Sequence, residues 1–279
     1  MSPTPSHLAG AGAVAVAGPE PFRVFVGYDS REDIAYRVCR RSLLRRSSIP
    51  LDVIPIVQQE LREAGLYWRE RGPTESTEFS FTRFLTPHLA GYRGWALFVD
   101  CDFLFVADVA DLARLAASAD PRHAVLCVHH DYTPTEATKM DGAVQTVYPR
   151  KNWSSMVLFN CGHSKNRAAL TPEAVSTRSG AYLHRFMWLD DDEVGEVPFV
   201  WNFLVGHNKV DPADEAATAP RAIHYTSGGP WFERYKDCEF ADLWVQERDA
   251  YEAEEEKKKV EEEGVKAAVQ MSSAVSVDA

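Results

Sequence analysis

The feature that most constrains the fold is a run of five apolar residues, Trp95 to Val99, that leads directly into Asp100. A strand with no polar residue on either face must be covered on both sides, as in the centre of a parallel sheet packed between helices. Ligands of such sheets gather beyond the carboxyl ends of the strands. The run therefore predicts a central strand of an α/β sheet and marks Asp100 as a candidate site residue.

Short β-branched and aromatic runs alternate with helical segments along much of the chain. Residues 23–28 and 51–57 are two such runs, and the segment between them, about residues 31–47, keeps helical spacing of its apolar positions. We also expect a helix within residues 78–89 and further strands at residues 124–129, 155–160 and 222–225. Strands interleaved with helices predict a single α/β domain with a mostly parallel central sheet.

The two ends of the chain differ from this pattern. Residues 8–18 are mainly Ala, Gly and Val, follow no basic segment and are too short to span a bilayer. Residues 252–263 read EAEEEKKKVEEE and cannot bury an apolar face, so we expect disorder or a solvated helix ending near Gly264. We predict a flexible arm at residues 1–21, a folded domain at residues 22–250, a charged helical or disordered tail at residues 251–279, and no transmembrane helix.

Composition narrows the choice of partners and compartment. The net charge of −11 argues against nucleic acid as the main partner, because phosphate binding needs a basic surface. The five cysteines are odd in number, and none forms a CxxC pair. They indicate buried thiols in a reducing compartment, so we expect a cytoplasmic protein.

Asp100 and Asp102 flank Cys101 directly after the apolar run. In an extended segment, residues two apart point the same way, so the two carboxylates are expected to converge at the mouth of the strand. Carboxylate oxygens are hard ligands that suit Mg²⁺ or Mn²⁺, and such a cation can also hold diphosphate oxygens. The alternative is structural, because Asp also favours helix caps and turns after a strand.

A second candidate lies in HYTSGGPW, residues 224–231, where His224 follows a short predicted strand. Gly228, Gly229 and Pro230 predict a loop that can approach a ligand closely. A neutral imidazole is a good third ligand for Mn²⁺. A single His is more often structural, and the glycine-rich loop favours the ligand role.

Together, the Asp-x-Asp triplet, the late His loop ending in Pro-Trp and the Tyr-Asp after the first predicted strand resemble GT-A fold glycosyltransferases, specifically those of glycosyltransferase family 8. The resemblance covers about residues 23–231. It implies a Rossmann-like GT-A domain in which Asp100, Asp102 and His224 bind Mn²⁺ or Mg²⁺. It also implies a nucleotide-sugar donor, UDP-linked, and retaining transfer of its sugar to a glycan or small hydroxyl acceptor.

The same resemblance extends to the donor pocket. There the Tyr-Asp pair would bind the nucleobase, an arginine would lie near the diphosphate, and a pair of serines would hydrogen-bond sugar hydroxyls. An ordinary strand or a helix-surface arginine is the structural alternative. The matching residues are Tyr28, Asp29, Arg83, Asp100, Ser154, Ser155, Gly228 and Trp231.

Asp190 and Asp191, in WLDDDE, match an Asp-Gln pair near the transferred sugar in the family, with Asp in place of Gln. They are the candidate catalytic carboxylates, and either would be the general base if transfer were inverting. An exposed acidic turn is the structural alternative. Further on, Trp201-Asn202 matches a Trp-Asn element near the family's core.

The chain departs from the family pattern in the His loop. The family usually carries a Lys before Pro-Trp, which neutralises the diphosphate, and Gly229 stands at that position here. Either a cation from elsewhere replaces it, or the metal and backbone N–H groups hold the leaving group alone. The candidate cations are Arg83, Arg150, Lys151 and Arg234.

Two other functions are compatible with an Asp-x-Asp after an apolar strand. One is a haloacid-dehalogenase-type phosphohydrolase, in which the first Asp is the nucleophile. That family places the motif on its first strand, whereas at least two predicted strands precede it here. The other is a non-catalytic protein that binds a nucleotide-sugar.

Overall fold

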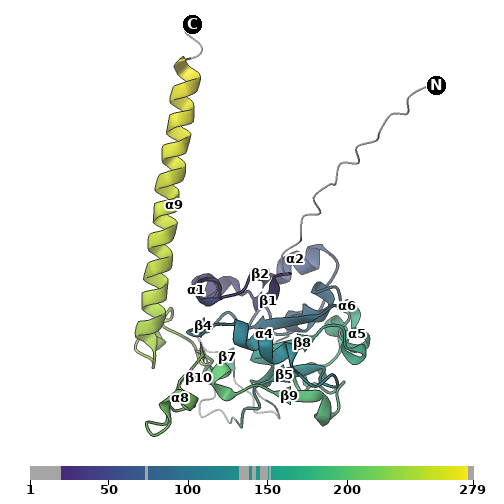
Figure 1. The fold of residues 1–279 in the computed structure, drawn as a ribbon. Coiled ribbons are helices and arrows are strands. Elements are labelled where there is room, and N and C mark those ends of the chain that lie inside the picture. The colour runs from purple at the N-terminus through teal and green to yellow at the C-terminus, as the bar shows by residue number, and fades with distance from the viewer. Residues whose placement is uncertain are drawn as a thin grey trace, which may run out of the picture.

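A six-stranded sheet in the order β2-β1-β3-β8-β5-β9 forms the centre of the molecule (Figure 1). This computed structural model describes residues 20–72, 75–131, 138–139, 143–144, 150 and 152–275, with no side chains described for 138–139, 143–144 and 267–275. The strands are β1 (Phe22–Gly27), β2 (Leu51–Ile56), β3 (Trp95–Val99), β5 (Val125–Cys127), β8 (Met156–Asn160) and β9 (Val194–Glu196). The predicted α/β fold with a mostly parallel sheet is confirmed.

The direction of the strands decides where a site can form. Strand β1 pairs parallel with β2 and β3, β5 pairs parallel with β9, and β8 is antiparallel to both β3 and β5. The carboxyl ends of five strands therefore meet at one edge, together with the start of β8. Asp29, Asp100 and His130 follow β1, β3 and β5 at this edge, beside the turn η3 (Trp153–Ser155) that precedes β8.

A small second sheet lies next to this edge, in the order β10-β11-β4. Its strands are β4 (Phe103–Phe105), β10 (Phe203–Leu204) and β11 (Ala222–His224). Because β4 and β11 are antiparallel, His224 at the end of β11 lies opposite Phe103 at the start of β4. The residue before Phe103 is Asp102, so this pairing brings the late histidine to the acidic triplet.

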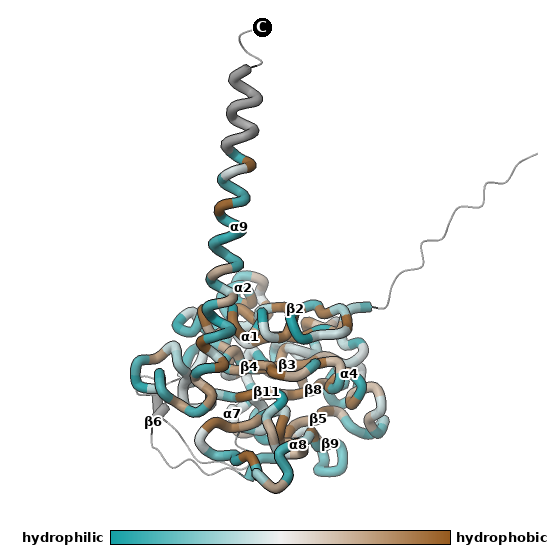
Figure 2. Tube along the Cα trace, turned by 60° about the vertical axis from the view of Figure 1, so that its left-hand side comes forward, coloured by the Kyte–Doolittle hydropathy of each residue, from teal (hydrophilic) through white to brown (hydrophobic). Residues whose placement is uncertain are grey.

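The core is built on β3 and β8, in which residues 96–99 and 156–159 are fully buried. Burying a side chain such as Phe98 or Leu158 contributes roughly 1.5–3 kcal/mol each. Helix α1 (Asp33–Arg46) packs on β1, β2 and β4, while α3 (Thr86–Leu89) and α4 (Ala110–Ala117) pack on β3 and β8. The apolar strands run through the body in Figure 2.

The remaining elements are short. The α-helices are α2 (Gln58–Glu63), α5 (Ser164–Ala169), α6 (Pro172–Thr177), α7 (Gly180–His184) and α8 (Glu215–Thr218). The 3-10 helices are η1 (Ser30–Glu32), η2 (Thr82–Leu85), η4 (Asp191–Glu193), η5 (Phe199–Asn202) and η6 (Glu233–Tyr235). Strands β6 (Thr138–Lys139) and β7 (Ala143–Val144) form a two-stranded antiparallel sheet.

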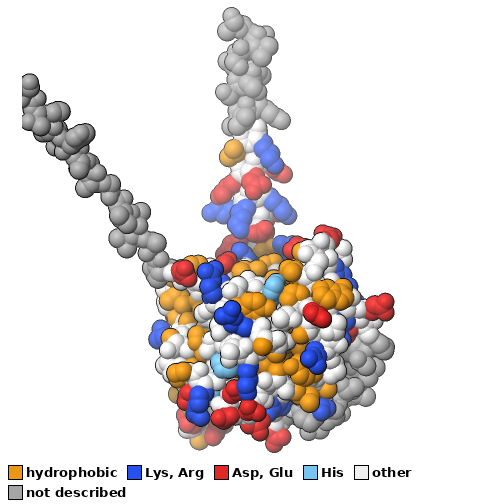
Figure 3. All heavy atoms as spheres, turned by 90° about the vertical axis from the view of Figure 1, so that its right-hand side faces the viewer, with side chains coloured by type: hydrophobic (Ala, Val, Ile, Leu, Met, Phe, Trp, Pro, Cys, Tyr) orange, Lys and Arg blue, Asp and Glu red, His pale blue; other side chains and the backbone are white. Residues whose placement is uncertain are grey.

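A long helix, α9 (Ala241–Val275), starts against α1 and projects from the body (Figure 1). Trp244 is buried at its base, and beyond Tyr251 its described side chains are almost all exposed. Acidic and basic side chains cluster on the exposed part (Figure 3). The expectation that the helix ends near Gly264 is wrong. A glycine within a helix costs only about 1 kcal/mol, and the flanking Glu and Lys residues have high helix propensity, so the helix continues through Gly264.

Several local expectations need adjustment. The strand expected at residues 124–129 is limited to Val125–Cys127, and Ser155 belongs to η3 rather than to β8. The helix expected within residues 78–89 consists of η2 followed by α3. The predicted arm at residues 1–21 lies almost entirely outside the described residues. Within the part of the chain that the structure describes, no helix combines the length and apolar character needed to cross a membrane.

Candidate functional site

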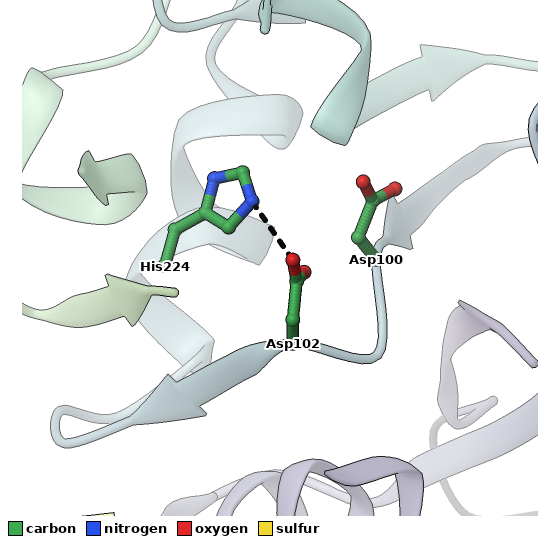
Figure 4. A group of neighbouring side chains, drawn as sticks. All are labelled: Asp100, Asp102 and His224. Carbon is green, nitrogen blue, oxygen red and sulfur yellow. Dashed lines mark ion pairs between the residues drawn. The ribbon is translucent and has the colours of Figure 1, made fainter. Parts of the chain in front are cut away.

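Asp100, Asp102 and His224 come together at the carboxyl edge of the sheet (Figure 4). One ligand atom from each residue lies within 4.8 Å of the other two. His224 Nε2 is 3.3 Å from Asp102 Oδ2. The structure thus brings together the three residues that the sequence singled out as metal ligands.

Backbone contacts fix these three positions. The Asp100 N–H donates to the carbonyl of Ser155 at 2.9 Å, and the Tyr225 N–H donates to the carbonyl of Asp102 at 3.0 Å. The His224 ring stacks on Phe103, with centroids 4.3 Å apart and planes inclined by 18°. The site is therefore held by sheet pairing and stacking rather than by a free loop.

Arg83 is a buried cation in contact with the triplet. Its Nη1 lies 2.8 Å from Asp100 Oδ1 and also donates to the Ser154 carbonyl at 2.8 Å. Its Nε donates to the Phe79 carbonyl at 3.3 Å. Arg83 therefore places a buried positive charge against the Asp100 carboxylate.

Asn202, which the sequence did not identify as part of the site, lies behind His224. Asn202, at the end of η5, is fully buried, and its Oδ1 is 2.8 Å from His224 Nδ1. Its Nδ2 donates to Ser155 Oγ at 2.9 Å, and that hydroxyl donates to the Asn152 carbonyl at 2.7 Å. The Trp-Asn pair in the sequence was the available signal, but a two-residue match gives no role.

His130 was also missed. It follows β5 at the same edge of the sheet. Burial, and then the proximity of His224, lower the pKa of His130 to about 3, so it is neutral in the folded protein. Its carbonyl accepts from Trp153 Nε1 at 3.0 Å. The signal was a His-His pair at the end of a predicted strand.

The residues predicted to bind the nucleobase follow β1. Tyr28 donates from its hydroxyl to Asp33 Oδ1 at 3.0 Å. Asp29 is fully buried and accepts from Arg31 and from the Glu78 N–H. Burial alone would raise the pKa of Asp29, but the hydrogen bonds from Arg31 and the backbone lower it overall. The Asp29 carboxylate therefore caps η1 and ties it to residue 78.

The loop after His224 is shaped by glycine. Gly228 has φ +124°, and a Cβ there would lie 2.7 Å from the Tyr235 ring, so only glycine fits this turn. Trp231 packs on Trp244 and Tyr225, with centroids 5.2 and 5.9 Å away. Trp231 is thus part of an aromatic cluster that attaches the loop to the base of α9.

Among the described residues, the cluster of possible metal ligands does not include the two candidate catalytic carboxylates. Asp190 and Asp191 are at the start of η4, with side chains 78% and 91% exposed. Lys165 Nζ is 2.7 Å from Asp190 Oδ2, and Arg150 pairs with Asp191. The catalytic role of Asp190 and Asp191 stays a prediction.

The other residues predicted to contact the donor include Ser154 and Ser155, in η3, and Arg83, in η2. Ser154 is buried, and its Oγ lies 2.9 Å from His184 Nδ1. Ser155 is occupied by the contact with Asn202. Of the cations considered as replacements for the missing loop Lys, Lys151 lies outside the described residues, and Arg83 pairs with Asp100.

The fold is shared with known glycosyltransferases. The bifunctional glycosyltransferase WbbM superposes with a TM-score of 0.57 at 14% identity over 85% of this chain, and GlyE of Streptococcus pneumoniae TIGR4 with 0.52 at 14% over 87%. The chain spans 51% of the WbbM chain and 64% of the GlyE chain. At this identity the likeness shows a common GT-A fold, and membership of family 8 stays a prediction.

Sequence comparison identifies a nearer relative. No family model matches the chain. Protein CDI of Arabidopsis thaliana, whose name states no activity, is 64% identical over 238 residues, which cover 85% of this chain and 90% of that protein. The chain therefore belongs to the same family as Protein CDI.

Proposed function

We propose that this chain is a metal-dependent glycosyltransferase that moves a sugar from a nucleotide-sugar donor, UDP-linked, to a glycan or other hydroxyl acceptor. The observation that carries the proposal is the convergence of Asp100, Asp102 and His224 at the ligand-binding edge of a fold shared with glycosyltransferases. In open α/β sheets this edge is where ligands bind.

The three candidate ligand side chains suit a divalent cation. Two carboxylates and an imidazole suit Mn²⁺ or Mg²⁺, and the nitrogen ligand favours Mn²⁺. His224 Nε2 and Asp102 Oδ2 face each other at 3.3 Å. With a neutral imidazole that presents its Nε2 lone pair, both atoms are acceptors, so their approach is unfavourable unless a cation or a proton lies between them. Arg83 Nη1 lies 2.8 Å from Asp100 Oδ1.

The chain's own residues prepare the site for a diphosphate leaving group. When bound, the cation would supply Lewis-acid stabilisation of charge that builds on the diphosphate. Arg83 adds fixed positive charge in a buried setting, where such charge is most effective. Because Gly229 replaces the usual loop Lys, Arg83 is our candidate for the missing cation. Retaining transfer, proposed from the family resemblance, requires no general base; Asp190 or Asp191 would be needed only for inversion.

The test is turnover of UDP-sugars with Mn²⁺, with and without EDTA, after a thermal-shift screen for donors that stabilise the fold. Wild type should transfer or hydrolyse a donor, and EDTA and Asp102→Ala should each abolish turnover. Asp120→Asn, a change to an exposed carboxylate paired with Arg122, is the control. Full metal-dependent turnover by D102A would refute the assignment.

The same assay separates the alternatives. Mn²⁺-dependent UDP binding without turnover of any donor would identify a non-catalytic binding protein. Release of phosphate from simple phosphomonoesters would favour the phosphohydrolase.

A further inference from the structure

A buried hydrogen-bond relay lies directly behind His224. It runs from His224 Nδ1 to Asn202 Oδ1 at 2.8 Å, from Asn202 Nδ2 to Ser155 Oγ at 2.9 Å, and from Ser155 Oγ to the Asn152 carbonyl at 2.7 Å. The side chains of His224, Asn202 and Ser155 are at most 3% exposed. Water is therefore not available to replace a missing partner, and each bond must have a defined donor.

The direction of the relay can be deduced from its far end. The Asn152 carbonyl can only accept, so the Ser155 hydroxyl donates to it and keeps its lone pairs for Asn202. The group of Asn202 that faces Ser155 must then be the NH₂ group, which places the amide oxygen against His224. An amide oxygen can only accept, so His224 Nδ1 must carry a proton.

We propose that Asn202 is a positioning residue that fixes the Nδ1–H form of His224 and thereby aims the Nε2 lone pair at the cation site. The half of this inference that concerns the cation rests on the proposed function, whereas the protonation of Nδ1 does not. Metal-ligating histidines commonly donate their second N–H to such a partner, whose loss lowers metal affinity about 10–100-fold.

The same relay reaches Asp100. The turn η3, which begins after Asn152 in the left-handed conformation with φ +64°, supplies the carbonyl of Ser155 to the Asp100 N–H and the carbonyl of Ser154 to Arg83. One turn therefore orients a carboxylate through the backbone and the imidazole through Asn202. Asn202 is the link by which the late His loop is held in register with the acidic triplet.

The experiment reads the protonation of His224 directly. Nitrogen-15 NMR spectra of histidine-labelled protein are recorded without metal at about pH 8.5, which is above the ordinary His pKa. The His224 signals are identified by their loss in His224→Gln. We compare wild type with Asn202→Leu, Asn202→Asp and Ser155→Ala. The control is Asn160→Leu, the same change at the end of β8 opposite Trp95, at the other edge of the sheet.

Wild type and N160L should show a protonated Nδ1. In N202L the proton should move to Nε2, where Asp102 accepts it, and S155A should give a mixture because the amide is free to turn. N202D should keep the protonated Nδ1, since a carboxylate also accepts. If N202L does not fold, S155A and N202D provide the comparison. A protonated Nδ1 in both N202L and S155A, or its loss in N202D, would overturn the proposal.

A Mn²⁺ titration of the same proteins tests the claim that Asn202 supports cation binding by His224. Affinity should fall about 10–100-fold in N202L and remain within a few-fold of wild type in N160L and N202D. Equal affinity in N202L and wild type overturns this half. If wild type binds no Mn²⁺ while the NMR result holds, the proposed metal function fails and the positioning of His224 by Asn202 stands.

Discussion

At the scale of single residues, the site depends on a buried ion pair. The side chains of Arg83 and Asp100 are 8% and 13% exposed, and their atoms lie 2.8 Å apart. Removal of one partner from such a pair leaves an uncompensated charge and costs about 3–5 kcal/mol. A divalent cation bound at Asp100 would compensate the same negative charge. The stabilisation of the fold by the cation should therefore be larger when Arg83 is absent.

We therefore expect Arg83→Leu to lower the free energy of unfolding by about 3–5 kcal/mol in EDTA. The increase in Tm on addition of Mn²⁺ should be larger in R83L than in wild type, because the cation replaces the lost charge. Thermal unfolding with EDTA and with Mn²⁺ measures both quantities. Equal Mn²⁺-induced shifts in the two proteins would show that the cation does not bind at Asp100.

Asp29 gives a pH-dependent prediction. Its folded pKa is lowered overall, so its charged form adds stability above its unfolded pKa of about 3.9, and that stability is lost as the pH falls through the folded value. Asp29→Asn should reduce the free energy of unfolding by about 1–3 kcal/mol at pH 7. The difference from wild type should shrink below about pH 4. Urea unfolding at several pH values tests this, and a pH-independent difference would contradict it.

At the scale of elements, helix α9 is attached to the body mainly through α1. Arg41 pairs with Glu247 and Glu254, while Arg46 Nη1 lies 2.8 Å from Glu247. The side chains of Arg41 and Glu247 are 9% and 5% exposed. These buried pairs, together with Trp244, fix the first turns of α9, and the rest of the helix has little tertiary support.

Arg41→Met should therefore lower the free energy of unfolding by about 1–3 kcal/mol, since Glu247 keeps Arg46 as a partner. The matched control is Lys257→Met, in an exposed pair with Glu261 at 3.9 Å, which should change stability by less than about 0.5 kcal/mol. Urea unfolding measures both changes. Equal effects of R41M and K257M would mean that α9 is not anchored by Arg41.

Sequence patterns predicted the helices and strands well where the apolar periodicity is strong. They predicted short strands poorly where a strand forms only because it pairs with a strand distant in sequence. The apolar runs that became β1 and β3 were visible because burial on both faces leaves a composition signal. Strand β2, at the edge of the sheet, is only partly buried and was visible from its β-branched run. Strands β4 and β10 have three and two residues and exist because β11 pairs with them. No local sequence pattern predicts such a strand. The relay through Asn202 was hidden for the same reason, since its partners are distant in sequence.

At the scale of the whole molecule, the fold class followed from the sequence, whereas the end of the domain is still a prediction. The boundary expected after residue 250 separates Tyr251 and Glu254 from α1, although Tyr251 Oη accepts from Arg37 at 2.9 Å and Glu254 pairs with Arg41 at 2.6 Å. These contacts indicate that the first turns of the tail contribute to the stability of the domain.

A chain that ends after Lys258 should therefore keep the Tm of the full chain, and a chain that ends after Ala250 should unfold earlier. A loss of 1–2 kcal/mol corresponds to roughly 2–8 °C for a domain of this size. Thermal unfolding of the two truncated chains measures the difference. Equal Tm values would place the boundary at residue 250, as the composition of the tail suggested.

The central claim is that Asp100, Asp102 and His224 form one cation site. Its most direct test is Mn²⁺ binding by electron paramagnetic resonance, which counts free Mn²⁺ and needs neither donor nor acceptor. Wild type and Asp120→Asn should bind a single Mn²⁺, and Asp102→Asn and His224→Gln should each weaken binding by at least about tenfold, since each removes a ligand. Unchanged Mn²⁺ binding in both D102N and H224Q would contradict the account.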